Sequence, residues 1–287
     1  MKTIGITLGD QAGIGPEIVD AALERLELPD GVQVRVLGKR LSGVVLGEPS
    51  IETAQAALDD LESAVALMKS GEIDAVVTAP VAKEGLHQVG FHFPGQTEFF
   101  AERLSCDNYA MCLTGKSLTV ALVTIHVPIA AVPGLLSAGE IIRVGQLLAQ
   151  FLERKNRRTA RVAVCGLNPH ASENGAFGDE EARVIEPAIE QLRAAYPEAE
   201  FSGPHPPDTV FGAAVQGEYD GVLCMYHDQG LIPLKLLDFD SGVNTTLGLP
   251  VPRTSPDHGT AFAIAGKGVA KADSMLCAIQ TASDLLR

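Results

Sequence analysis

The segment MKTIGITLGDQAGIGPEIVDAALERLELPDGVQVRVL (Met1–Leu37) holds one complete unit of the fold. Its apolar, β-branched runs Thr3–Leu8 and Val32–Leu37 predict two strands, and Pro16–Arg25 between them predicts a helix. A helix that connects two strands is typical of a crossover between parallel strands. The rest of the chain continues this alternation, so we predict an α/β protein with a largely parallel sheet and flanking helices.

The same patterns predict the remaining regular elements. Strands are expected over Ala75–Thr78, Thr119–Ile125, Arg161–Gly166 and Gly221–Tyr226, and helices over Ile51–Ser70, Glu98–Leu104, Ile141–Glu153, Glu180–Tyr196 and Met275–Leu286. No repeat, low-complexity tract or Gly/Ser linker marks a boundary. We therefore expect residues 1–287 to form a single two-lobed catalytic unit.

Composition limits the partners and the location. The formal net charge of -14 predicts no nucleic-acid partner, because phosphate backbones bind basic surfaces. The five cysteines are scattered and include no C-x-x-C pair, which predicts free thiols and a reducing, cytoplasmic location. The apolar run Leu118–Leu136 is interrupted by His126, Pro128 and Pro133, so it predicts a strand and a loop and not a membrane span.

Three histidines lie just beyond the ends of predicted strands. The strand TVALVTI leads into His126, RVAVCGL leads into Asn168-Pro169-His170, and GVLCMY leads into His227. Parallel strands direct their carboxyl ends to one edge of the sheet, where α/β proteins bind ligands. Three imidazoles that leave a coordination position open are typical of a catalytic metal site, so we favour metal binding over capping or packing. The other four histidines are expected in loops or turns: His87, His92, His205 and His258.

Three further segments have less specific patterns. Gly9–Glu17 has the glycines and the proline of an anion-binding helix start, but the same residues are typical of a tight strand-to-helix turn, and we favour the turn. Lys235 and Arg253, expected at strand or turn positions, form the basic cluster that an anionic substrate needs, although solvated surface charges explain them as well. Ser255–Gly268 allows close backbone approach to a flat ligand but lacks the Rossmann glycine pattern.

Seven stretches together resemble the 4-hydroxythreonine-4-phosphate dehydrogenase family of pyridoxal phosphate biosynthesis over nearly the whole chain. They are GDQAGIGPE (9–17), VVTAPVAKE (76–84), FPGQTEFFA (93–101), GLNPHASENGAFG (166–178), PPDTVF (206–211), YHDQGLIPLK (226–235) and GVNTTLGLPVPRTSPDHGTAFAIAGKG (242–268). The resemblance implies a two-lobed fold of the isocitrate/isopropylmalate dehydrogenase type, which binds NAD or NADP without a Rossmann glycine motif.

The resemblance also implies roles for particular residues. One divalent ion per subunit (Zn, Mg or Co) is expected on His126, His170 and His227, at a homodimer interface with ligands from both chains. Substrate contacts carry over to Thr97, Lys235, Asn244 and Arg253, with Gln96 where the family has a histidine for the phosphate. The nucleotide loop carries over to His258, Gly259, Thr260, Ala261, Gly266 and Lys267. The proton acceptor is Lys235 or Asp228, and Lys235 is preferred.

The implied reaction oxidises the secondary alcohol of 4-hydroxythreonine-4-phosphate by hydride transfer to NAD(P)+, with the metal as a Lewis acid. The β-keto acid product loses CO2 and gives 3-amino-2-oxopropyl phosphate. The chain departs from the family at Gln96 and in its shortness between Arg40 and Ile51. Two related activities stay open, a phospho-threonate or phospho-erythronate dehydrogenase and a cis-dihydrodiol dehydrogenase. A zinc hydrolase, or a binder of metal or nucleotide, is the alternative outside the dehydrogenases.

Overall fold

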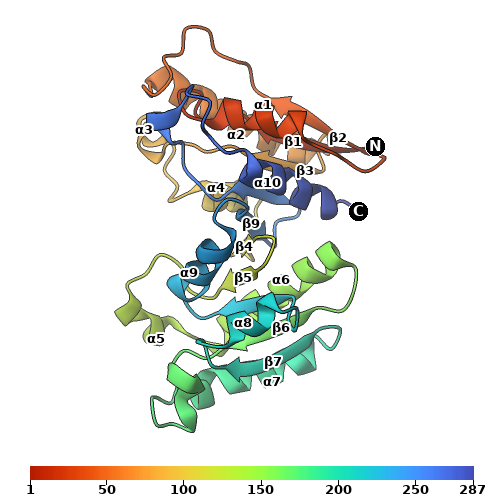
Figure 1. The fold of residues 1–287 in the computed structure, drawn as a ribbon, viewed down its shortest axis with the longest axis vertical. Helices are drawn as coiled ribbons and strands as arrows, with labels where there is room; N and C mark the ends of the chain where they lie inside the picture. Colours follow the sequence, from red (N-terminus) through yellow and green to blue (C-terminus); the bar gives the residue numbers. More distant parts are fainter. The chain divides into compact units, whose positions relative to one another are not determined.

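The computed structural model describes residues 1–287 and divides them into two compact units (Figure 1). Unit 1 consists of Met1–Asp107 and Asp240–Arg287, and unit 2 consists of Asn108–Phe239. Unit 1 is therefore built from both ends of the chain, whereas unit 2 is one continuous segment.

Unit 1 contains a sheet of five strands in the order β2-β1-β3-β10-β9. The strands are β1 (Lys2–Thr7), β2 (Val32–Leu37), β3 (Ala75–Thr78), β9 (Val243–Leu247) and β10 (Arg253–Pro256). All neighbours in this unit are parallel except β9 and β10. Because β10 lies between β3 and β9, the C-terminal segment completes a sheet that the N-terminal segment begins.

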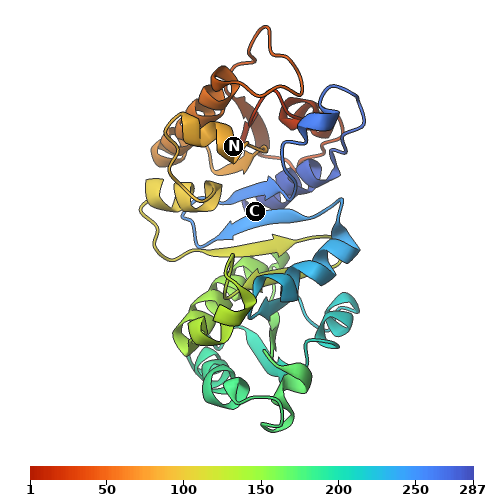
Figure 2. The ribbon, with the colours of Figure 1, turned by 90° about the vertical axis from the view of Figure 1, so that its left-hand side faces the viewer.

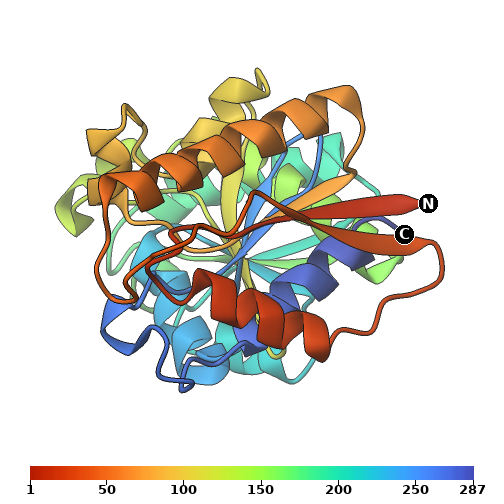
Figure 3. The ribbon, with the colours of Figure 1, turned by 90° about the horizontal axis from the view of Figure 1, so that it is seen from above.

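The helices of unit 1 cover both faces of its sheet. They are α1 (Gly15–Glu24), α2 (Ile51–Ser70), α3 (Lys83–Gln88), α4 (Gln96–Arg103), η4 (Phe262–Ile264) and α10 (Asp273–Asp284). Figure 3 shows α2 on one side of β1 and β2, with α1 and α10 on the other. Ile6, Ile18 and Met275 are fully buried in the core that β1, α1 and α10 share. Such a core forms because each of these helices has one apolar face.

The sequence of α2 encodes both of its ends. Ser50 accepts a hydrogen bond from the backbone N–H of Thr53, and the Thr53 hydroxyl accepts one from the backbone N–H of Ser50, which makes a capping box. Gly71 ends the helix in the left-handed region at φ 75°, where glycine is favoured. These signals explain why the predicted range Ile51–Ser70 is also the observed range.

Unit 2 contains five strands in the order β4-β5-β8-β6-β7. They are β4 (Ala110–Thr114), β5 (Thr119–Leu122), β6 (Arg161–Cys165), β7 (Glu200–His205) and β8 (Gly221–Cys224). Within this unit only β4 and β5 are antiparallel. Strands β5, β8 and β6 are parallel neighbours, so their carboxyl ends lie at the same edge.

Helices cover both faces of this sheet as well. They are η1 (Ile129–Ala131), α5 (Val132–Leu135), α6 (Ala138–Asn156), η2 (Pro169–Glu173), the π-helical turn η3 (Glu181–Ile185), α7 (Glu186–Ala195), α8 (Val210–Val215) and α9 (His227–Asp238). Figure 2 shows α6 and α7 on one face and α8 and α9 on the other. Alternate strand residues face these layers: Val120 and Leu122 pack toward α8 and α9 in a core that leaves out the intervening Ala121.

The structure confirms the predicted α/β class and the largely parallel pairing, and it corrects several local predictions. Lys235, expected at a strand or turn, lies on α9. His205, expected in a loop, ends β7, and His87 lies on α3. The predicted helix Glu180–Tyr196 divides into η3 and α7. The strands β4, β7, β9 and β10 were not predicted.

No single helix combines the length and the apolar character needed to cross a membrane. One pair of helical segments, Ile129–Leu135 and Ala138–Asn156, is long and apolar enough when the two are taken together, by length and composition alone, but the pair is bent by 97°.

Candidate active site

Two of the three strand-end histidines lie together in unit 2. The ring centroids of His126 and His227 are 5.4 Å apart, and both side chains line a cavity of about 150 Å³. The two segments that carry them are connected, because the N–H and the hydroxyl of Thr124 both donate to the carbonyl of Met225, at 3.2 and 2.7 Å. His126 and His227, which both lie beyond strand ends, therefore come together in the structure.

The orientation of His227 suits metal binding. Its Nδ1 forms a hydrogen bond of 2.7 Å with Oδ1 of Asp228. An imidazole held in this way keeps Nε2 available for a ligand, and a carboxylate behind a histidine is the usual support of a metal-bound imidazole. Asp228 also lines the cavity. The donor set of two imidazoles with a carboxylate behind one of them fits a divalent transition metal.

His170 does not join this pair within the chain. It is exposed on η2, its nearest ring neighbour is Phe177 at 6.1 Å, and no three His, Cys, Asp or Glu side chains of the chain come together as a metal site. The backbone around it is strained: five successive non-glycine residues, His170 to Asn174, have φ between 45° and 66°. Left-handed backbone of this kind costs about 1–2 kcal/mol per residue.

The proposed proton acceptors both lie on α9. Asp228 is in its first turn and Lys235 is seven residues later, so the two side chains lie on the same face of the helix, two turns apart. Lys235 is half-buried, with Nζ 5.9 Å from the centre of the Phe239 ring. Asp228 is exposed, but one of its carboxylate oxygens is occupied by His227.

In unit 1, Arg253 is the centre of a buried polar cluster. Its side chain donates to Thr78 at 2.7 and 3.1 Å, Gln96 at 3.1 Å, Thr246 at 3.3 Å and Thr97 at 3.4 Å. Arg253 is only 3% exposed, and every one of these acceptors is neutral. We call these five residues the Arg253 cluster. A buried cation without a carboxylate partner is costly, so this cluster is suited to receive an anion.

The charge of Arg253 and a buried amide nearby also suit the Arg253 cluster to an anion. Burial lowers the pKa of Arg253 to about 10, although the charge of Glu98 opposes the shift, so the guanidinium is protonated at neutral pH. Asn244, on β9, pairs in register with Ser255 of β10, and its Oδ1 is buried without a hydrogen-bond partner. The structure thus brings together three of the residues that were predicted to contact substrate, Gln96, Thr97 and Arg253. Thr78 and Thr246, which were not predicted, lie beside them.

The expected nucleotide loop packs against the turn that follows β1. Ile14 donates its N–H to the carbonyl of Thr260 at 2.9 Å, and Gly266 donates its N–H to Glu17 at 3.1 Å. A Cβ at Gly13 would lie 2.6 Å from the oxygen of Thr260, so a larger residue does not fit there. The N–H groups of residues 12–14 are used within the protein, which supports the tight-turn interpretation of Gly9–Glu17 over an anion site.

The remaining residues of that loop are accessible. His258, Gly259, Ala261, Gly266 and Lys267 are exposed and Thr260 is half-buried. Ala261 has a left-handed φ of 45°, and Nδ1 of His258 lies 3.1 Å from the carbonyl oxygen of Gly259. The loop is therefore anchored at Thr260 and Gly266 and exposed between them.

A family model described as pyridoxal phosphate biosynthetic protein PdxA matches residues 15–282. The chain belongs to the PdxA family. It is 45% identical to the 4-hydroxythreonine-4-phosphate dehydrogenase of Desulfosudis oleivorans over 322 aligned positions, which cover 98% of the chain and 95% of the relative. The alignment is longer than the 287 residues of the chain, so this relative has residues that the chain lacks.

Solved structures agree with this membership. The 4-hydroxythreonine-4-phosphate dehydrogenase of Klebsiella pneumoniae superposes with a TM-score of 0.85 at 38% identity, and both chains are covered completely. A terephthalate 1,2-cis-dihydrodiol dehydrogenase of Burkholderia xenovorans has a TM-score of 0.72 at 26% identity, covering 99% of this chain and 98% of that one. An isocitrate dehydrogenase of Methylococcus capsulatus, at 18% identity and a TM-score of 0.55 over 100% of this chain and 86% of that one, shares the fold. The expected 4-hydroxythreonine-4-phosphate dehydrogenase family, the fold and the dehydrogenase class are confirmed.

Proposed function

We propose that the chain oxidises 4-hydroxythreonine-4-phosphate with NAD or NADP, and that the β-keto acid product decarboxylates to 3-amino-2-oxopropyl phosphate. The Arg253 cluster carries this proposal, because its buried guanidinium has only neutral acceptors and a phosphate would supply the missing negative charge. Thr97, Thr78 and Thr246 offer hydroxyl groups to further phosphate oxygens. The loop from His258 to Lys267 would hold the nucleotide.

A divalent ion (Zn, Mg or Co) would be held by His126, His170 and His227. When bound, such an ion polarises the oxygen of the substrate alcohol as a Lewis acid. Imidazole ligands favour Zn or Co over Mg. Asp228 would orient His227 through Nδ1, and this bond already occupies one of its carboxylate oxygens. We therefore assign the role of proton acceptor to Lys235.

The missing third ligand supports a homodimer in which a second copy of the chain brings its His170 to the pair of His126 and His227. Several apolar side chains on and next to α9 are exposed to solvent, which is typical of a surface that another protein covers: Ile232, Leu236, Leu237 and Phe239. None of the five cysteines is in a disulfide, which supports the proposed cytoplasmic location.

The test is reduction of NAD+ or NADP+, followed at 340 nm, with the phosphorylated substrate and a divalent ion. We expect reduced cofactor to form only when all three are present, and mass spectrometry to detect 3-amino-2-oxopropyl phosphate. Phospho-threonate, phospho-erythronate and a cis-dihydrodiol serve as alternative substrates in the same assay. Preference for the dihydrodiol would contradict the role of the Arg253 cluster, and hydrolysis without reduced cofactor would indicate a metal hydrolase.

A further inference from the structure

The segment that carries His170 does not adopt a conformation that its residues favour. Of the five residues from His170 to Asn174, only the first and the last belong to residue types that often occupy the left-handed region. Ala171, Ser172 and Glu173 have no such preference. A run of this kind persists only where the surrounding structure holds it in place.

The side chain of Glu181 holds the beginning of this segment. Its Oε1 accepts hydrogen bonds from the backbone N–H groups of Leu167 and Asn168, both at 2.7 Å, and its Oε2 accepts one from Nδ2 of Asn168 at 2.9 Å. Glu181 is fully buried, and none of these partners is a cation. The carboxylate is therefore satisfied by the loop itself and not by an ion pair. Hydrogen bonds to a carboxylate are roughly twice as strong as bonds between neutral groups.

Gly166 lies between the Glu181 carboxylate and the left-handed segment. A Cβ at Gly166 would lie 3.0 Å from Oε1 of Glu181 and 3.0 Å from Cβ of Ala171, so only glycine fits at this position without a shift of its neighbours. Glu181 begins the π-helical turn η3, which replaces the first turn of the predicted helix. Single π-helical turns occur frequently at functional sites.

A second buried side chain connects this loop to His227. Gln229, on α9, donates Nε2 to the carbonyl of Gly166 at 2.8 Å and accepts from the N–H of Met225 at 2.7 Å. Met225 lies two residues before His227 and also accepts from Thr124, two residues before His126. The strand ends that carry the three histidines are thus linked through buried hydrogen bonds, and Glu181 fixes the one whose backbone is strained.

We propose that Glu181 is a positioning residue for the metal site: it holds the left-handed segment 170–174 so that the imidazole of His170 is presented to a divalent ion. This inference rests on the proposed function, because it requires that His170 binds the metal. It assigns a role to a carboxylate that contacts neither substrate nor metal.

The experiment measures Co2+ binding to the full-length metal-free protein, by chelator competition and by the visible absorption spectrum of the bound ion. Glu181→Gln keeps the size and one acceptor oxygen but turns a donor toward Nδ2 of Asn168. We expect Co2+ affinity to fall about 10- to 100-fold, as it does when the support of a metal ligand is removed, and the absorption bands to change. Glu181→Ala should fall further.

Two control variants separate positioning from general destabilisation. Asp220→Asn alters a buried acid in the same unit, at the amino ends of β6 and β8, whereas the histidines lie beyond the carboxyl ends. Glu186→Gln alters an exposed acid on α7. Both should bind Co2+ with wild-type affinity and spectrum, although Asp220→Asn lowers the unfolding temperature.

The outcomes are distinct. A Glu181→Gln protein that binds Co2+ within twofold of wild type overturns this inference alone. An equal loss of affinity in Asp220→Asn also overturns it, because the effect would then be one of stability. If the wild type binds no Co2+, the proposed metal site fails and this inference fails with it. Should Glu181→Ala not fold, the Gln variant still decides.

Discussion

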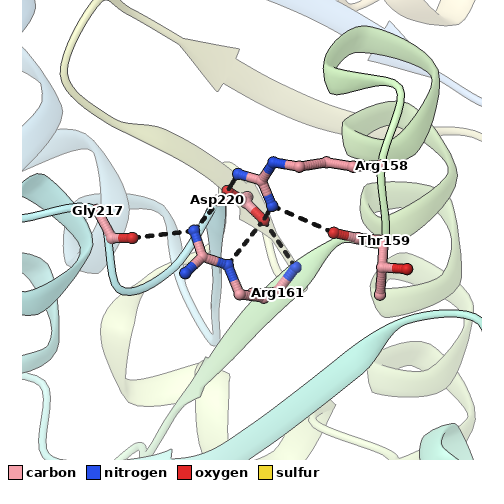
Figure 4. Close-up of polar contacts among 5 residues, drawn as sticks. All are labelled: Arg158, Thr159, Arg161, Gly217 and Asp220. Carbon is pink, nitrogen blue, oxygen red and sulfur yellow. Dashed lines mark hydrogen bonds and ion pairs between the residues drawn. The ribbon is translucent and has the colours of Figure 1, made fainter.

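Two arginine clusters, one in each unit, use opposite arrangements of charge. In unit 1 the buried Arg253 is surrounded by neutral acceptors. In unit 2 the buried Asp220, whose side chain is 5% exposed, binds both Arg158 and Arg161, an arrangement that we call the Asp220 clamp. Figure 4 shows the two guanidinium groups converging on Asp220, with the carbonyl of Gly217 accepting from Arg161.

The two clusters serve different purposes: the Asp220 clamp stabilises the fold, whereas the Arg253 cluster is suited to bind an anion. In the Asp220 clamp the buried charge is neutralised within the chain, so the clamp joins the starts of β6 and β8 and needs no ligand. In the Arg253 cluster the compensating charge must come from outside. A buried cation without a counter-charge lowers the free energy of unfolding, but it forms a preorganised site for an anion.

The largest effect is expected for Arg253→Met. Removing one member of a buried charge pair costs roughly 2–5 kcal/mol, so kcat/KM for the phosphorylated substrate should fall about 30-fold or more. The unfolding free energy without ligand should stay equal or rise, because an uncompensated buried charge is lost. Steady-state kinetics and urea unfolding measure the two quantities. A variant that is destabilised but keeps wild-type kcat/KM would reverse the comparison.

Asp220→Asn should give the opposite pattern. The substitution leaves Arg158 and Arg161 without their carboxylate, and we expect a loss of roughly 2 kcal/mol in the free energy of unfolding. The value of kcat/KM should change less than twofold, because the clamp lies at the amino ends of the strands and the histidines lie beyond the carboxyl ends. Reduced activity at full stability would show that the clamp contributes to the site.

The Asp220 clamp should make the free energy of unfolding depend on pH. Burial alone would raise the pKa of Asp220, but hydrogen bonds from Arg158 and Arg161 outweigh it and hold the pKa below its ordinary value. The clamp therefore stabilises the fold fully above the ordinary aspartate pKa of about 4 and loses this contribution as the pH falls through the lower, folded value. Urea unfolding between about pH 6 and 3 should show a smaller drop for Asp220→Asn than for wild type. Parallel curves would contradict the assignment.

The smallest effect is expected for Gln96→His. Gln96 accepts from Arg253 through Oε1, and an imidazole offers a positive charge to the phosphate where the amide offers a neutral hydrogen bond. We expect KM for the phosphorylated substrate to fall up to about tenfold, and more at low pH where the ring is protonated. With the dephosphorylated substrate the variant should be neutral or worse, because the new charge then faces Arg253. Equal use of both substrates by the wild type would exclude a phosphate at this position.

The fold could be predicted where local signals are strong. The capping box and Gly71 fixed the ends of α2, and the β-branched runs fixed β2 and β3. Helix α9 was missed because Gly230 and Pro233 interrupt its pattern. The glycine is needed there: a Cβ would lie 3.0 Å from Sγ of Cys224 and 3.1 Å from the side chain of Leu122, so it allows the helix to pack closely on the sheet.

Part of the candidate site could also be predicted. His126, His170 and His227 were predicted to lie close together because parallel strands place their carboxyl ends at one edge of a sheet, and the structure brings His126 and His227 together. The threonines of the Arg253 cluster gave no signal, since Thr78 and Thr246 resemble any other strand threonine. Glu181 gave none either, because its partners are backbone amides of a distant loop whose conformation no local propensity predicts.

The discontinuity of unit 1 has a consequence for synthesis on the ribosome. Residues 108–239 emerge as one continuous segment and can fold while the chain is still growing. The first 107 residues cannot complete their sheet until β10 emerges to pair with β3, nor bury the apolar faces of β1 and α1 until Met275 and Ile279 of α10 arrive. The earliest part of the nascent chain is therefore the last to be finished, and it is the part that needs protection from aggregation until translation ends.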